Sequence, residues 1–182
     1  MSQPVVRYLS TRTSKPNDSD WLELLIMTSF SKGARDNVFT IEVSDLQDLK
    51  WYVDAAFAVH PYLKSHTGIV FTLGKRTIIS GSTKQKMNTR SSTEAELVGV
   101  DDVIQQTLWT RQFVLAQGYE LKEIIVQQDN LSTMMLATKG TAGSSNRMRH
   151  FDIRLFFIKD KVDSKEVSLQ YTTTTDLTAD YS

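Results

Sequence analysis

The chain has 182 residues, 40% of them hydrophobic and 23% charged, which is typical of a globular protein with one domain and room for a short appendage. It contains no cysteine, so disulfides and thiolate metal sites are excluded, and any metal must be held by oxygen or imidazole ligands. No apolar run approaches the roughly 18 residues of a membrane span, and the N-terminus lacks a secretory signal. We therefore expect an intracellular protein with no membrane partner.

Basic residues are concentrated in one part of the chain. Lysine plus arginine and aspartate plus glutamate number 21 each, but residues 55–93 contain no acidic residue. The basic residues of this segment are Lys64, Lys75, Arg76, Lys84, Lys86 and Arg90. Such a segment suits binding of a polyanion, although lysines that only keep a solvated hairpin soluble would produce the same pattern.

Residues 1–45 differ in pattern from the rest of the chain. The residues from Asn17 to Asp20 are typical of a helix start, with Glu23 placed for a capping box behind Asp20, and Val38–Val43 alternates like a short strand. One helix and one strand cannot bury a core, so we expect this segment to be a remnant of a preceding domain or to pack on the main one. The main domain is then residues 46–182.

The main domain is expected to begin with three strands. Residues 51–57, WYVDAAF, alternate with a period of two, and the segments HTGIVFTL and RTIISGS read as a hairpin that turns at Gly74 and Lys75. One face of the first strand carries Trp51, Val53, Ala55 and Phe57. Asp54 lies on the other face, in a position where aspartate is disfavoured.

A long helix comes next and runs to about Gln117. Its apolar side carries Leu97, Val100, Val103, Ile104, Leu108 and Leu115. Glu96 lies at the inner edge of that side, where a carboxylate is costly unless it is paired or binds a metal. Helical spacing directs a second set of residues toward water: Glu94, Asp101, Gln105 and Gln112. Glu96 is thus the candidate ligand, and a capping or salt-bridge contact is its alternative role.

A strand over Ile124–Gln128 leads directly into a helix for which Asn130 is a plausible cap. Strand, helix and strand predict a parallel crossover, and sites in such sheets form beyond the carboxyl ends of strands. Asp129 is placed there, with N-capping as its alternative role. A helix with Phe151, Leu155 and Ile158 on one side and a strand over Val167–Tyr171 complete the pattern.

Four carboxylates, on Asp54, Glu96, Asp129 and Asp180, could converge at one edge of this sheet. Asp180 lies in a terminal helix that the chain cuts short. Oxygen ligands without a histidine or cysteine set suit hard ions such as Mg²⁺. Two such ions about 4 Å apart can activate a water and stabilise the leaving oxygen of a phosphodiester.

Several long blocks resemble the ribonuclease H domain of copia-type LTR retrotransposon polyproteins, over about residues 49–180. The blocks are YVDAAFAVHPYLKSHTG, GSTKQKMNTRSSTEAELVGVDD, LWTRQFVLAQGY, QQDNLSTMML and RHFDIRLFFIKDKVD. The upstream TRTSKPNDSDWLELL resembles the tail of the reverse transcriptase that precedes this domain. The resemblance implies an α/β fold with a ribonuclease H-like mixed five-stranded sheet, three antiparallel strands and then parallel strands, flanked by helices.

The family's reaction is hydrolysis of the RNA strand of an RNA/DNA hybrid with two Mg²⁺ ions, or Mn²⁺ in their place. The resemblance implies that Asp54 bridges the ions, with Glu96 and Asp129 on one side and Asp180 on the other. It also implies two partners, the hybrid and the reverse transcriptase domain of the same polyprotein, in a cytoplasmic virus-like particle or the nucleus.

Polar and basic residues near the long helix are candidates for contacts to phosphates or 2′-hydroxyls. They are Lys84, Lys86, Asn88, Arg90, Ser91, Ser92, Thr93 and Asn130. One residue of the Ser91–Thr93 segment is also expected to cap the helix. Three histidines match family positions, and for His60, His66 and His150 we expect structural roles.

Two departures from the family keep other functions open. The family continues past the Asp180 position with FTKPL-like residues, and it has a Cys-Pro-Thr stretch where this chain has TTTTDLT. One alternative is a decayed domain that binds hybrid or packs on reverse transcriptase without cleaving. Another is a nuclease of the same fold that acts on DNA.

Overall fold

The computed structural model describes residues 2–36, 48–74, 76–121, 123–139 and 149–176. These residues form two compact units, the first within residues 2–36 and the second within 48–176. Within the described ranges, no helix has both the length and the apolar character that a bilayer span requires.

The first unit consists of two helices, α1 (Ser2–Ser10) and α2 (Asp18–Gly33). Helix α2 begins with a capping box, but Asn17 is the cap and Asp20 is its partner. The Asn17 side chain accepts a hydrogen bond from the Asp20 N–H at 2.9 Å, and the Asp20 carboxylate accepts one from the Asn17 N–H at 2.8 Å. The predicted helix start within Asn17–Asp20 is therefore confirmed, whereas the predicted capping box of Asp20 with Glu23 was wrong. The predicted strand Val38–Val43 lies outside the described residues.

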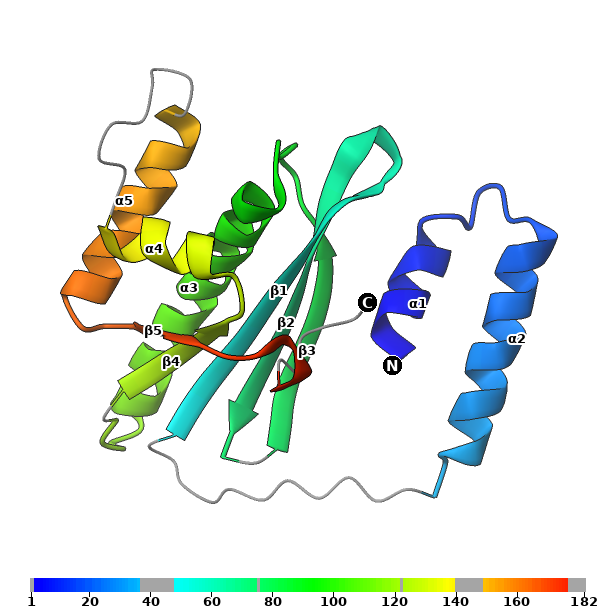
Figure 1. Cartoon of the computed structure of the whole chain (residues 1–182). Helices are drawn as coiled ribbons and strands as arrows, with labels where there is room; N and C mark the ends of the chain where they lie inside the picture. Colours follow the sequence, from blue (N-terminus) through cyan, green and yellow to red (C-terminus); the bar gives the residue numbers. More distant parts are fainter. Residues whose placement is uncertain (1, 37–47, 75, 122, 140–148, 177–182) are drawn as a thin grey trace. The chain divides into compact units, whose positions relative to one another are not determined.

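The second unit is built on one mixed sheet (Figure 1). Its strands are β1 (Asp48–His60), β2 (Lys64–Leu73), β3 (Arg76–Lys84), β4 (Glu123–Gln128) and β5 (Ser168–Tyr171). The order across the sheet is β3-β2-β1-β4-β5. Strands β1 to β3 pair antiparallel, whereas β4 pairs parallel with both β1 and β5. The predicted sheet of three antiparallel strands followed by parallel strands is confirmed.

Three helices lie together on one side of this sheet: α3 (Ser92–Ala116), α4 (Leu131–Lys139) and α5 (Arg149–Asp163) (Figure 1). Helix α3 connects β3 to β4 and packs against β1 and β2. Two short 3₁₀ turns, η1 (Pro61–Leu63) and η2 (Thr174–Asp176), follow β1 and β5.

The alternation predicted for β1 holds through its first half. Trp51 and Val53 are fully buried, whereas Phe57, which was predicted on the same face, is 41% exposed. The pairing of β1 with β2 shifts register beyond Ala56, and Ala58 has a φ of 55°. Phe57 lies within this irregular stretch, where the period of two is interrupted.

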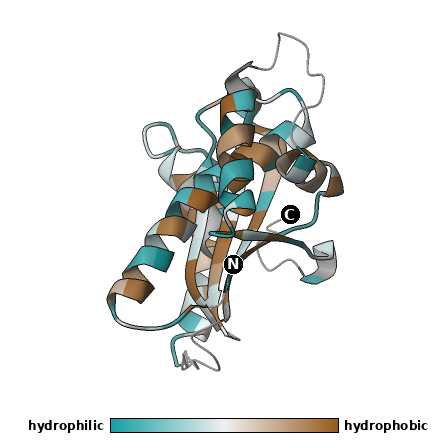
Figure 2. Cartoon of the chain, turned by 90° about the vertical axis from the view of Figure 1, so that its left-hand side faces the viewer, coloured by the Kyte–Doolittle hydropathy of each residue, from teal (hydrophilic) through white to brown (hydrophobic). Residues whose placement is uncertain are grey.

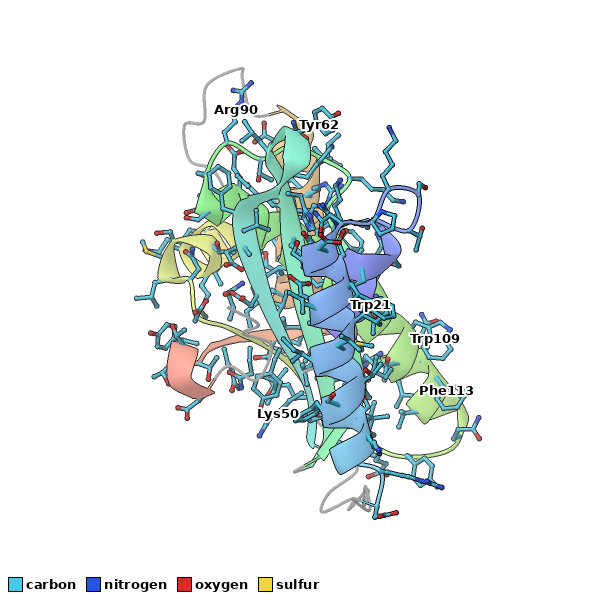
Figure 3. All side chains as sticks on the ribbon, turned by 90° about the vertical axis from the view of Figure 1, so that its right-hand side faces the viewer. Trp21, Lys50, Tyr62, Arg90, Trp109 and Phe113 are labelled. Carbon is cyan, nitrogen blue, oxygen red and sulfur yellow. The ribbon has the colours of Figure 1, made fainter. Side chains whose placement is uncertain are left out.

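The core lies between the sheet and the inner face of α3, and Figure 2 shows hydrophobic colouring along the central strands. The predicted apolar face of α3 is buried at Leu97, Val100, Val103 and Ile104, and Leu108 packs against the core. Leu115 was predicted on this face but is 40% exposed. The rings of Trp109 and Phe113, which Figure 3 labels, stack at 5.5 Å and are also exposed. These three side chains of the last turns of α3 are therefore largely outside the core, although Val114 packs against it.

The burial of Asp101 contradicts another prediction. It was expected to face water with the polar side of α3, but it is 7% exposed. Helix α5 packs against α3, and Nη1 of Arg154 lies 2.5 Å from Oδ2 of Asp101. On α5, Leu155 and Ile158 are buried as predicted, and the Phe151 side chain lies outside the described residues.

Candidate functional site

Three carboxylates from three separate elements converge in the second unit. Asp54 lies on β1, Glu96 in the second turn of α3, and Asp129 directly after β4. One carboxylate oxygen from each residue lies within 4.8 Å of those of the other two. The convergence predicted for these three side chains is therefore seen in the structure, and it creates a candidate site for a divalent cation.

Close packing of α3 on β1 brings Glu96 toward Asp54. Gly99 lies one turn after Glu96, and a Cβ at Gly99 would stand 3.2 Å from Cγ2 of Val53, the residue before Asp54. That distance is shorter than ordinary van der Waals contact, so the helix can approach the strand this closely because residue 99 has no side chain. Buried Gln85 strengthens the arrangement, since its amide NH₂ donates to the Ala95 carbonyl at 2.9 Å.

The start of α3 explains why Glu94 and Glu96 differ. Ser91 is the N-cap, and its hydroxyl accepts a hydrogen bond from the Glu94 N–H at 3.2 Å. The Glu94 carboxylate reaches back and accepts from the Arg90 N–H at 2.7 Å. Glu94 thus takes part in capping, while Glu96 is 5% exposed and faces the other two carboxylates.

Burial and charge repulsion act on Glu96 together. Burial is the main cause that raises the pKa of Glu96 from 4.5 to about 8, and the nearby charge of Asp54 adds to it. Hydrogen bonds from the Gln128 side chain and the Ala55 backbone oppose this shift in pKa, and Asp129 raises the pKa slightly further. A divalent cation would favour the charged carboxylate and so lower this pKa.

Gln128 contacts both Glu96 and the backbone that carries Asp129. Its side chain is fully buried at the end of β4, and its Nε2 donates to Oε2 of Glu96 at 3.1 Å. Its Oε1 accepts from the N–H groups of Asp129 at 2.7 Å and Asn130 at 3.1 Å. This residue was not predicted from the sequence. The sequence feature that could have identified it is a polar residue at the end of an apolar strand, directly before a candidate ligand.

Asp129 is held by one further contact, and its neighbour Asn130 caps the helix that follows. The hydroxyl of Thr174, in η2, donates to its Oδ2 at 2.9 Å, a contact that no spacing in the sequence indicates. Asn130 caps α4, because its Oδ1 accepts from the Thr133 N–H at 3.1 Å. The predicted cap is therefore confirmed, and N-capping as the role of Asp129 was wrong. Asp180, the proposed fourth carboxylate, lies outside the described residues, and its role stays a prediction.

The basic segment leads from β3 to the start of α3. Its side chains Lys84, Lys86, Asn88 and Arg90 are exposed. The Asn88 amide donates to the Tyr62 carbonyl at 3.2 Å, and Figure 3 shows Tyr62 and Arg90 at the same end of the second unit. The segment is thus accessible to a polyanion. Contacts of these residues, of Ser91, Ser92 and Thr93, and of Asn130 with nucleic acid stay a prediction.

Two of the three histidines contact each other. Nε2 of His60 lies 2.7 Å from Nδ1 of His66, and the other ring nitrogen of His66 bonds the Ser82 hydroxyl. Burial is the main cause that lowers the pKa of His60, and the charge of Lys84 contributes. These contacts fit the structural role expected for both rings, and the side chain of His150 lies outside the described residues.

No family model matches the chain. It is 27% identical over 176 residues to the retrovirus-related Pol polyprotein from transposon TNT 1-94 of Nicotiana tabacum, a match that covers 96% of this chain and 13% of the polyprotein. The chain thus spans about an eighth of the length of the transposon polyproteins it matches first.

Among solved structures, LC11-RNase H1 in complex with an RNA/DNA hybrid is 12% identical, with a TM-score of 0.51 over 72% of this chain and 89% of that one. The protease-reverse transcriptase of prototype foamy virus is 13% identical, with a TM-score of 0.50 over 89% of this chain and 25% of that one. The chain is thus similar in sequence to retrotransposon Pol polyproteins, and it has the fold of ribonuclease H structures, in agreement with the resemblance that the motifs indicated.

Proposed function

We propose that the protein is a ribonuclease H, which hydrolyses the RNA strand of RNA/DNA hybrids with the help of Mg²⁺. The observation that carries this proposal is the convergence of Asp54, Glu96 and Asp129 within 4.8 Å. Carboxylate oxygens are the ligands that Mg²⁺ prefers, and Mn²⁺ accepts the same set. This donor set fits the hard cation that the fold family implies.

The electrostatics of the three carboxylates also favour a cation. Glu96 is 5% exposed, and Asp54 and Asp129 both act on it as like charges. A buried carboxylate is costly unless it is paired or coordinates a metal. We propose that Asp54, Glu96 and Asp129 hold one or both of two ions, and that Asp180 contributes the fourth ligand.

In the proposed reaction, two bound ions would supply an activated water and stabilise the leaving oxygen of the phosphodiester. The protein's own residues then have two tasks. The three carboxylates fix the positions of the ions, and the exposed basic residues Lys84, Lys86 and Arg90 attract the phosphate backbone. Asn88, Asn130 and the Ser91–Thr93 segment are proposed to contact phosphates or 2′-hydroxyls, which distinguish RNA from DNA.

The similar proteins suggest the setting of this activity. LC11-RNase H1 was solved with an RNA/DNA hybrid, and the foamy virus protein is a protease-reverse transcriptase. We propose that the chain acts in retrotransposon replication, beside the reverse transcriptase of the same polyprotein, of which residues 1–45 are the tail. The proposed location is a cytoplasmic virus-like particle or the nucleus.

The test is cleavage of a hybrid labelled on its RNA strand, with Mg²⁺ present, by the wild-type chain and by Asp54→Asn. Cleavage by the wild type alone is expected, and equal activity of the two proteins would refute the assignment. Duplex DNA of the same sequence should stay intact, since its degradation would indicate a DNA nuclease of the same fold. Hybrid binding that survives chelation, without cleavage in Mg²⁺ or Mn²⁺, would instead favour a non-catalytic domain.

A further inference from the structure

Gln128 is the residue through which two of the candidate ligands are connected. Its side-chain NH₂ contacts the Glu96 carboxylate on α3, and its side-chain oxygen receives the backbone N–H groups of Asp129 and Asn130. One amide group therefore joins the helix that carries Glu96 to the turn that carries Asp129. The side chain is 0% exposed, so packing restricts its rotamer.

The orientation of this amide is determined by its partners. The two backbone N–H groups can only donate, so the amide oxygen must face the turn, and the amide nitrogen then faces the Glu96 carboxylate. A flipped amide would set oxygen against oxygen and nitrogen against nitrogen at all three contacts. Gln128 is therefore held in one state, and in that state it orients both the Glu96 carboxylate and the Asp129 backbone.

We propose that Gln128 is a positioning residue for metal binding, which couples Glu96 to Asp129 without contacting the ion itself. This proposal rests on the proposed function, because it assumes that the carboxylates hold Mg²⁺. Partners of metal ligands typically contribute roughly 10- to 100-fold to metal affinity or activity. The same range is expected for the donor that Gln128 directs at Glu96.

A purely structural role for Gln128 would have different consequences for metal affinity. Two substitutions distinguish the structural role from the positioning role. In Gln128→Asn, the shorter side chain can still accept the N–H group two residues on, that of Asn130, as in an Asx turn, but its NH₂ falls short of Glu96 by about one bond length. In Gln128→Met, both sets of hydrogen bonds are lost. Gln127→Met is the matched control, since Gln127 lies beside it on β4 and its NH₂ contacts Gln170 at 3.4 Å.

The experiment uses the full chain without nucleic acid. Mg²⁺ binding is measured by isothermal titration calorimetry, and thermal unfolding is measured in EDTA. Gln128→Asn should raise the dissociation constant for Mg²⁺ by roughly 10- to 100-fold while its melting temperature stays near that of the wild type. Gln128→Met should lower both affinity and melting temperature, and Gln127→Met should change neither. If Gln128→Met does not fold, the Mg²⁺ affinity of Gln128→Asn alone tests the positioning role.

Wild-type affinity for Mg²⁺ in Gln128→Asn would overturn the positioning role and leave the proposed function standing. Conversely, a wild-type chain that binds Mg²⁺ but does not cleave hybrid would refute the proposed function, while the calorimetry still decides the role of Gln128. A wild-type chain that binds no Mg²⁺ would overturn both. With hybrid, Gln128→Asn should lower kcat and leave KM for the hybrid near the wild-type value.

Discussion

Asp54 and Glu96 bring their carboxylates together from a strand and a helix that Gly99 allows to pack closely. Burial and this neighbour raise the pKa of Glu96 to about 8, so the fold keeps a carboxylate where its charged form is disfavoured. A fold that needed only stability would gain from an apolar residue at this position. The arrangement therefore makes specific predictions about pH and metal.

The stability of the metal-free protein should fall as pH rises. Between the ordinary Glu pKa of 4.5 and about 8, the unfolded chain releases the Glu96 proton whereas the folded chain retains it, so the free energy of unfolding decreases across this window. The full loss, on the order of a few kcal/mol, is present above pH 8. Urea unfolding in EDTA from pH 5 to 8.5 measures it. Glu96→Gln should lack this part of the slope, and parallel profiles for the two proteins would contradict the prediction.

Mg²⁺ should stabilise the folded chain because it binds where the carboxylates repel one another. At about 100 times its dissociation constant, a ligand of the folded state contributes roughly 2.7 kcal/mol, which for a chain of this size raises the melting temperature by roughly 5–10 °C. Thermal unfolding with and without Mg²⁺ measures the shift. Asp54→Asn should reduce it, whereas Asp160→Asn, at an exposed carboxylate of α5, should keep it. An equal shift in both variants would show that Mg²⁺ acts elsewhere.

The sequence predicted the elements that have a simple period and the carboxylates that lie on them. Asp54 interrupts an apolar alternation, Glu96 borders an apolar helix face, and Asp129 ends a strand, so each was visible from its immediate neighbours. Their convergence could be expected from the parallel crossover, in which the carboxyl ends of β1 and β4 lie at one edge of the sheet.

The errors arose where burial depends on a distant element. Asp101 has the spacing of a solvent-facing residue, but α5 covers it with Arg154, and no local pattern reports that contact. Phe57 lies within an irregularity in the pairing with β2, between Ala56 and His60, where the alternation is interrupted. Thr174 contacts Asp129 from a turn far along the chain, so only the folded structure could connect them.

The ion pair between Arg154 and Asp101 should contribute measurably to stability. Burial raises the pKa of Asp101 and Arg154 opposes that rise, so Arg154→Met would leave a buried carboxylate without its cation. We expect a loss of roughly 1–3 kcal/mol in the free energy of unfolding, measured by urea denaturation. The double variant with Asp101→Leu should recover most of it.

The matched control for this pair lies on the same helix. Lys159→Met removes the cation of the exposed pair with Asp163, at 2.8 Å, and should change the free energy of unfolding by less than about 1 kcal/mol. Equal effects of Arg154→Met and Lys159→Met would show that the buried pair is worth no more than a surface pair.

The most direct test of the proposed metal site compares two glutamates in the first turns of α3. Glu96→Gln and Glu94→Gln are the same substitution two residues apart, and a glutamine at position 94 can still accept the Arg90 N–H through its side-chain oxygen. Cleavage of an RNA/DNA hybrid in Mg²⁺ should fall by about 100-fold or more in Glu96→Gln, because charge stabilisation by the metal is worth several kcal/mol. Glu94→Gln should cleave at nearly the wild-type rate. Equal rates in the two variants would contradict the assignment of Glu96 as a metal ligand.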